Sequence, residues 1–113
     1  MDKPKLAELL GAPPDTVFQI NDLQLIGWGS DVVFECIYQV ESAHIPFQMI
    51  LRDCREMHWR IYAHPGGDVK TRPPAALVNL RLGSDQHRKP LNMLTDFFGL
   101  TVLYGALVIE KST

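Results

Sequence analysis

The feature that most constrains the fold is a two-residue hydrophobic period in the segment "VVFECIYQVE" (32–41). The even positions of this segment are apolar or aromatic, whereas Glu35, Gln39 and Glu41 occupy odd positions. Successive side chains of a β-strand point to opposite faces, so this alternation is typical of a half-buried strand. Such a strand needs paired neighbours and a packed face, which favours an antiparallel β domain.

Neighbouring segments repeat the pattern with the opposite parity. In "FQMILR" (47–52) and "EMHWRIYA" (56–63) the apolar side chains occupy odd positions. Facing residues of an antiparallel pair lie on the same side of the sheet, so the connecting loop must have a length that matches the parity. An even loop ("ESAH" or "AH", 41–44), an odd loop ("CRE" or "RDCRE", 52–56) and a two-residue "GS" turn (29–30) meet this requirement. We therefore expect three successive hairpins.

In this arrangement Trp59 shares its face with Met57 and Ile61 and is expected to be a central anchor of the core. Further along the chain, "ALVNLRLG" (76–83) predicts a strand whose even residues, Val78 among them, point inward, and "PLNML" (90–94) predicts a shorter strand.

The last part of the sequence contains two more apolar runs. "FGLTVLY" (98–104) and "LVIEK" (107–111) can pair as a hairpin around Gly105-Ala106, because their alternating apolar residues then match. A helix over 96–104 is the alternative, since Asp96 could cap it. An internal glycine and β-branched residues disfavour that helix.

The N-terminal segment "KPKLAELLG" predicts a short helix with Pro4 in its first turn, Gly11 at its end and Leu6, Leu9 and Leu10 on one face. The predicted fold is thus mainly β, with about seven short antiparallel strands forming a sandwich or a partly open barrel. A chain of 113 residues is expected to be a single domain (1–113). It comprises an N-terminal helix and Pro-rich linker (1–15) and a β domain (16–113).

The outer face of the first strands carries an unexpected apolar cluster. Ile26, Val33, Ile37 and Ile50 all have the parity opposite to the core residues, and Ile26 is expected to face Val33. A contiguous exposed cluster of this kind usually needs cover. Either the N-terminal helix or a second sheet covers it, or it is a candidate interface for a homodimer or another protein.

Composition and charge limit the function classes. The chain is 46% hydrophobic with a net charge of −2, and no apolar run reaches the roughly 20 residues that span a bilayer. We therefore expect no membrane association. Two cysteines do not make a disulfide framework, and the N-terminus lacks the apolar core of a signal peptide, so a cytoplasmic location is expected.

The stretch "RDCREMHWRIYAH" (52–64) concentrates the residues most often used in chemistry. On a strand, Cys54 and His58 would lie about 13 Å apart, too far to share a metal ion. Cys36 is expected to be a buried and inert thiol. Arg52 and Arg55 flank Cys54 and could lower its pKa, although no base is visible beside it. We expect no catalytic residue, metal site or cofactor.

The clearest polar candidates lie in two basic loops, 70–74 and 84–90. Arg72, His87, Arg88 and Lys89 are candidate ligands for an anionic small molecule or a phosphate backbone. Nucleic acid is disfavoured as a partner, because no aromatic residues are interleaved with these cations.

The sequence therefore favours a non-enzymatic module for protein–protein interaction or assembly, with a homodimer as one form. The alternative is an anion-binding domain that uses the two basic loops.

Overall fold

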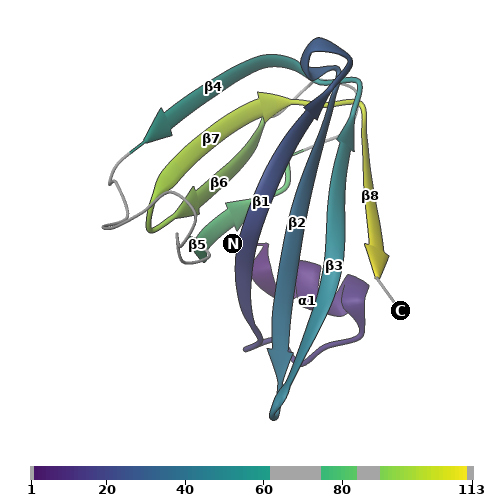
Figure 1. Ribbon diagram of the computed structural model, residues 1–113, viewed down its shortest axis with the longest axis vertical. Helices are drawn as coiled ribbons and strands as arrows, with labels where there is room; N and C mark the ends of the chain where they lie inside the picture. The colour runs from purple at the N-terminus through teal and green to yellow at the C-terminus, as the bar shows by residue number, and fades with distance from the viewer. Residues whose placement is uncertain (1, 62–74, 84–89, 112–113) are drawn as a thin grey trace.

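The computed structural model describes residues 2–61, 75–83 and 90–111 (Figure 1). Within these residues a helix is followed by eight strands, which form one open antiparallel sheet in the order β4-β7-β6-β5-β1-β2-β3-β8. The mainly β class is confirmed, with eight strands in place of about seven. The elements are α1 (Lys3–Leu10), β1 (Val17–Ile26), η1 (Gly27–Gly29), β2 (Asp31–Val40), β3 (Ala43–Arg52), β4 (Arg55–Ile61), β5 (Ala75–Arg81), β6 (Leu91–Thr95), β7 (Phe98–Leu103) and β8 (Ala106–Lys111).

The sheet consists of two parts that we call the first half-sheet (β1, β2, β3 and β8) and the second half-sheet (β5, β6, β7 and β4). Among the described residues, β1 and β5 join them through two residue pairs, Gln19 with Ala76 and Ile20 with Ala75. Figure 1 shows the second half-sheet curving away from the long strands of the first. Both halves contribute to one hydrophobic core.

Helix α1 forms where the sequence predicts it. Gly11 ends the helix with φ 71°, a left-handed conformation that glycine adopts without a steric penalty. Leu6 and Leu10 are buried in the core cluster that also contains Phe18, Tyr38 and Phe47. The expectation that Leu9 shares this face is wrong, because Leu9 is 55% exposed. Ala7 completes the buried stripe instead.

The hairpins β1–β2 and β2–β3 are confirmed, although their turns differ from the expected ones. Residues 41–42 alone connect β2 to β3, so the loop has even length as parity required. Between β1 and β2 the chain turns through four residues rather than two, and Leu25 therefore faces Val32. A shift of two positions keeps every side chain on its expected face.

A bulge in β1 changes the parity of that strand. The register with β2 shifts between Ile20 and Asp22. Phe18 and Ile20 are consequently buried at even positions, whereas Leu23 packs against the core from an odd position. One extra residue suffices for this change because the side-chain period of a strand is two.

The two other expected hairpins, β3–β4 and β7–β8, are wrong. Strand β3 pairs with β8, and β4 pairs with β7. The strand over residues 98–103 is nevertheless confirmed against the helical alternative. Both connections are corners at which the chain continues in a new direction rather than folding back.

The two corners lie side by side in one bent two-stranded ribbon. Phe47 pairs with Lys111, and the same register pairs Arg55 with Leu103. The two segments that form the ribbon therefore contain the same number of residues on their way through the corner. At the bend, the Gly105 N–H donates to the Arg52 carbonyl oxygen at 2.8 Å. Parity determines which face a side chain occupies, but it does not determine which strand is its neighbour.

Strand β4 is an edge of the sheet, which corrects the expectation for Trp59. Trp59 is 42% exposed and Ile61 is 60% exposed, so neither is a central core residue. Instead, the Trp59 indole stacks on Phe98 with ring centroids 4.5 Å apart and an interplanar angle of 17°. An edge strand has a neighbour on one side only and buries correspondingly less of its side chains.

Before its bulge, strand β5 has the parity opposite to the expected one, because Ala75 and Leu77 are buried whereas Ala76 and Val78 are not. The register with β6 shifts between Leu77 and Asn79, and Val78 is 48% exposed rather than inward. Leu80 and Leu82, beyond this bulge, are buried as expected.

Candidate functional site

The predicted interface residues lie together on the outer face of the first half-sheet. Val33 pairs with Ile50, and Ile37 lies farther along β2 on the same face. Ile26 faces Asp31 rather than Val33, because the β1–β2 turn is longer than expected.

These residues differ in how much surface they offer. Val33 and Ile50 are only 8% and 9% exposed, although neither belongs to the core cluster. Helix α1 does not cover them, since its buried side chains belong to the core on the opposite face of the sheet. Ile50 also pairs with Val108 of β8, so neighbouring side chains of the same face provide much of the cover. Ile26, at 49% exposed, retains the largest accessible fraction of the four, since Ile37 is half-buried.

The predicted anion-binding residues Arg72, His87, Arg88 and Lys89 lie outside the described residues. Binding through the loops 70–74 and 84–90 therefore stays a prediction.

The most exposed apolar side chain among the described residues lies where β1 turns into β2. Trp28 is fully exposed, at 107% relative accessibility, and Leu25 (55%) and Ile26 (49%) precede it. Trp28 has φ 62° and lies between Gly27 and Gly29, whose φ angles are also positive. Left-handed backbone is sterically unfavourable for a bulky residue and costs about 1–3 kcal/mol. This segment, which we call the hairpin tip (residues 25–30), therefore holds a large apolar side chain in water on a strained backbone.

A recess of about 390 Å³ lies directly beside the hairpin tip. On one side it is lined by Leu25 and Trp28, and on the other by Cys54, Glu56 and Met57 at the start of β4. The Cys54 N–H donates to the Ser30 carbonyl oxygen at 2.8 Å and so ties the bend of the ribbon to the tip. A protruding indole and a hollow thus occupy one patch of surface.

The thiol of Cys54 is not activated by its arginine neighbours. Burial raises the pKa of Cys54 to about 11, and the carboxylates of Asp31 and Asp53 add to this rise. The Cys54 Sγ donates to the Leu51 carbonyl oxygen at 3.4 Å. Cys36 has its pKa raised to about 12, mainly by burial. The expectation that Arg52 and Arg55 lower the pKa of Cys54 is therefore wrong.

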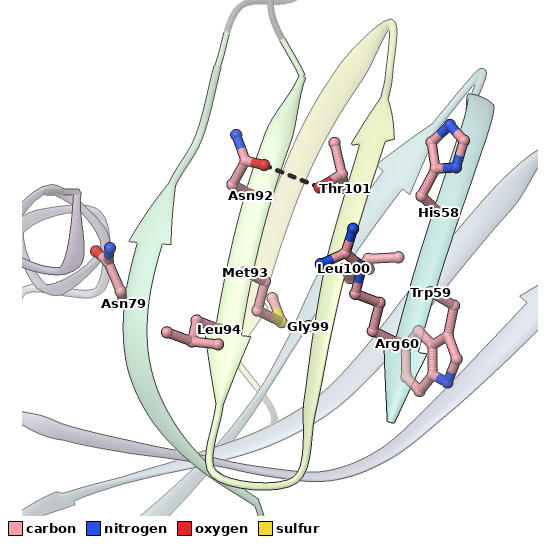
Figure 2. A pocket seen from close by; sticks show the side chains of 10 residues that line it. All are labelled: His58, Trp59, Arg60, Asn79, Asn92, Met93, Leu94, Gly99, Leu100 and Thr101. Atoms are coloured by element: carbon pink, nitrogen blue, oxygen red, sulfur yellow. Dashed lines mark hydrogen bonds between the residues drawn. The ribbon is translucent and has the colours of Figure 1, made fainter. Parts of the chain in front are cut away.

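A second hollow, of about 480 Å³, lies on the outer face of the second half-sheet, and we call it the outer groove (Figure 2). Two rows of paired residues cross this face. One row consists of His58, Thr101, Asn92 and Arg81, and the other of Arg60, Gly99, Leu94 and Asn79. Gly99 has no side chain, so it leaves a hollow between Arg60 and Leu94.

The outer groove is lined with hydrogen-bond donors. The Thr101 hydroxyl donates to Asn92 Oδ1 at 2.9 Å (Figure 2), which leaves both hydrogens of the Asn92 amide nitrogen for other partners. His58, Arg60 and Asn92 are exposed, and within the described part of the chain none of these three donates to a carboxylate. Asn79 Oδ1, by contrast, is buried and has no hydrogen-bond partner among the residues that the structure describes.

Two other kinds of site can be addressed directly. Among the residues that the structure describes, no three His, Cys, Asp or Glu side chains are placed to hold a metal ion. No helix in that part of the chain is long and apolar enough to cross a bilayer.

Comparison with known proteins adds no assignment, since no protein-family model and no curated protein sequence matches the chain. The geometry of the hairpin tip and of the outer groove therefore carries the functional argument.

Sequence reasoning missed both features. No functional role was predicted for Trp28, yet the triplet Gly27-Trp28-Gly29 contains a signal, because flanking glycines allow a turn that holds the indole outward. The alternation correctly directed His58 and Arg60 outward. Their neighbours Asn92 and Thr101 could not be found while β4 was paired with the wrong strand.

Proposed function

We propose that this protein is a non-enzymatic interaction module that self-associates through its hairpin tip. The observation that carries the proposal is Trp28, a fully exposed indole on a strained, left-handed backbone beside a recess. A tryptophan in water contributes little to the stability of a monomer, and the strain at its backbone subtracts from it. Binding is the process that makes such an arrangement favourable.

The size of the apolar surface supports a binding role. A buried tryptophan side chain removes about 150–250 Å² from water, and tryptophan is enriched among the residues that dominate binding energies. Leu25, which is 55% exposed and lines the recess, extends the apolar surface next to it. The predicted interface residue Ile26 follows Leu25 in β1 and points to the opposite face of the strand, and Val33 and Ile50 have little accessible surface left to contribute.

A second copy of the chain is the partner that the shape favours. In a two-fold symmetric dimer the same patch is used by both subunits, so it must complement itself. The hairpin tip meets this condition, because a protruding indole adjoins a recess of about 390 Å³. Arg55 and Glu56, both exposed at the rim of the recess, offer opposite charges that can pair across the two-fold axis.

The chemistry of the two thiols supports a reducing compartment such as the cytoplasm for this module. Cys36 and Cys54 are both free rather than joined in a disulfide. No residue is proposed to be catalytic.

The proposal can be tested by sedimentation velocity on the full chain over a wide range of concentrations. We expect the wild-type protein to shift from monomer to dimer as its concentration rises, and Trp28→Asn to remain a monomer. Trp59→Phe is the matched control, since it alters the other partly exposed tryptophan on the opposite half-sheet. A wild-type protein that stays monomeric throughout, or a Trp28→Asn variant that dimerises as well as the wild type, would overturn the proposal.

The control variant also provides a spectroscopic test. The chain has two tryptophans, so Trp59→Phe leaves Trp28 as the only indole. Its fluorescence should shift to shorter wavelength as the dimer forms, because the ring leaves water. An emission maximum that does not move while the protein dimerises would place the interface elsewhere.

A further inference from the structure

The outer groove of the second half-sheet has a chemistry unlike that of the hairpin tip. We propose that it binds an extended, carboxylate-rich segment of another protein. This inference does not depend on the role of Trp28, which lies at the tip of the first half-sheet.

Charge is the first argument. The eight residues of the two rows that cross this face include Arg60, Arg81 and His58 but no aspartate or glutamate. The chain as a whole has a net charge of −2, so this face is positive against the trend of the molecule. An acidic partner is therefore attracted to this face.

The direction of the hydrogen bonds is the second argument. Because the Thr101 hydroxyl donates to Asn92 Oδ1, the Asn92 amide presents donors to the groove. The guanidinium of Arg60 presents further donors, and a guanidinium binds a carboxylate through two parallel hydrogen bonds. A group that only accepts hydrogen bonds, as a carboxylate does, complements this lining.

The shape of the groove decides between a small ligand and a chain. Pockets for small molecules enclose most of the ligand surface. Here His58, Arg60, Asn92 and Leu94 are all exposed, so the hollow lies open on the face of the sheet. An extended segment can lie along such a groove and place several carboxylates against it, whereas a small anion would remain largely in water.

A protein segment also fits better than a nucleic acid. Single-stranded nucleic acids are usually held by aromatic side chains on which bases stack, in addition to cations. The two rows that cross the groove contain no Phe, Tyr or Trp, and the ring of Trp59 at its edge is already stacked on Phe98.

The test uses fluorescence anisotropy with the full chain and a labelled peptide of alternating Glu and Gly. A peptide with Gln in place of every Glu is the neutral control. We expect the acidic peptide alone to bind, and Arg60→Glu to weaken its binding by about tenfold or more. Arg52→Glu makes the same charge change at an exposed position of the first half-sheet and should change the affinity less than twofold.

Each outcome bears on one proposal only. Equal losses in Arg60→Glu and Arg52→Glu would show general charge attraction and would overturn the groove as a site. A single-stranded oligonucleotide that binds more tightly than the peptide, and depends on Arg60, would assign the face to nucleic acid instead. Thermal melting of both variants checks that they fold. Trp28→Asn should bind the acidic peptide like the wild type, so the failure of self-association would leave this inference standing.

Discussion

The two half-sheets of this protein are built from the same kind of strand, yet they differ in length, regularity and outer surface. In the first, β1, β2 and β3 each have ten residues, β8 has six, and one of the three strand pairings contains a register shift. In the second, the strands have five to seven residues, and two of the three strand pairings contain a register shift. Regular pairing buries side chains on both faces of the first half-sheet, as Val33 shows, whereas β4 leaves even Trp59 partly in water.

The outer faces differ in chemistry as well. A row on the first half-sheet contains Asp22, Glu35 and Glu110, in register with Gln48, whose amide donates to Glu35 at 2.7 Å. The outer groove of the second half-sheet contains arginine, histidine and amide groups instead. The regular half thus provides most of the rigid framework, and the irregular half presents a donor-lined surface for an acidic partner.

The largest expected effect comes from truncating one large aromatic residue in each half-sheet. The two variants compare how much each half contributes to the stability of the fold. Phe34 is fully buried in β2, so Phe34→Ala should lower the free energy of unfolding by about 3–5 kcal/mol. Trp59→Ala removes a larger side chain but should cost only about 1–2 kcal/mol, because 42% of Trp59 is already exposed. Urea denaturation measures both values at a concentration where the protein is monomeric.

Equal costs for the two truncations would contradict the comparison. They would mean that the edge strand β4 contributes as much to the cooperative core as the central strand β2.

The next largest loss of stability is expected for a substitution at the bend of the ribbon that links the two half-sheets. A Cβ atom at residue 105 would lie 3.0 Å from both Cβ and Oδ2 of Asp53, so Gly105→Ala should destabilise the fold by about 1–3 kcal/mol. Ala106→Val is the control, because residue 106 is exposed and its larger side chain can extend into solvent. If Gly105→Ala melts at the temperature of the wild type, the close approach at the corner is not a constraint on the fold.

This corner also shows which parts of the fold could be predicted from the sequence and which could not. The positions of Pro4, Gly11 and the leucines correctly predicted the helix, and alternation correctly predicted the strand over residues 98–103 and the inward faces of β2 and β3. It could not show that the segments around Asp53 and Gly105 are matching bends, because a hairpin and a corner both satisfy the same parity. The information that distinguishes them is a long-range contact between residues about fifty positions apart in the chain.

The same limit explains what was missed at the candidate sites. The outward directions of His58 and Arg60 follow from their positions in β4. The composition of the outer groove requires knowing that β4 pairs with β7 rather than β3. Local sequence does contain the Gly-Trp-Gly signal of the hairpin tip, but the exposure of Trp28 and the recess beside it depend on where the bend of the ribbon packs.

A smaller effect, of opposite sign, is expected at the hairpin tip. Asparagine adopts left-handed backbone more readily than tryptophan does, so Trp28→Asn should raise the stability of the monomer by about 1 kcal/mol. The same substitution should abolish self-association, so the variant gains stability as a monomer and loses binding. Thermal unfolding at low protein concentration gives the first quantity, and sedimentation the second.

A Trp28→Asn variant that is less stable than the wild-type monomer would show that the indole contributes to the fold. That result would remove the strain argument for the tip, although the exposure of the ring would remain.

The smallest effect concerns the two thiols, which report separately on the first half-sheet and on the corner between the halves. Burial and nearby carboxylates raise the pKa of Cys54 from 9.0 to about 11, and burial raises that of Cys36 to about 12. A thiol whose pKa is higher in the folded state favours folding below the pKa of the unfolded chain. That contribution is lost as the pH rises through the folded value, so stability should decline between about pH 9 and pH 12.

Alkylation at pH 8 distinguishes the two positions, because the thiolate is the reactive form. Cys54 should react about a hundredfold more slowly than a free cysteine, in line with its raised pKa. Cys36 lies in the regular half and should react only when the whole domain unfolds, so its rate should follow the free energy of unfolding as urea is added. Mass spectrometry of the labelled peptides separates the two rates. Alkylation of Cys36 at the same rate as Cys54 would show that the first half-sheet opens as readily as the corner, and the contrast between a rigid half and an irregular half would then be wrong.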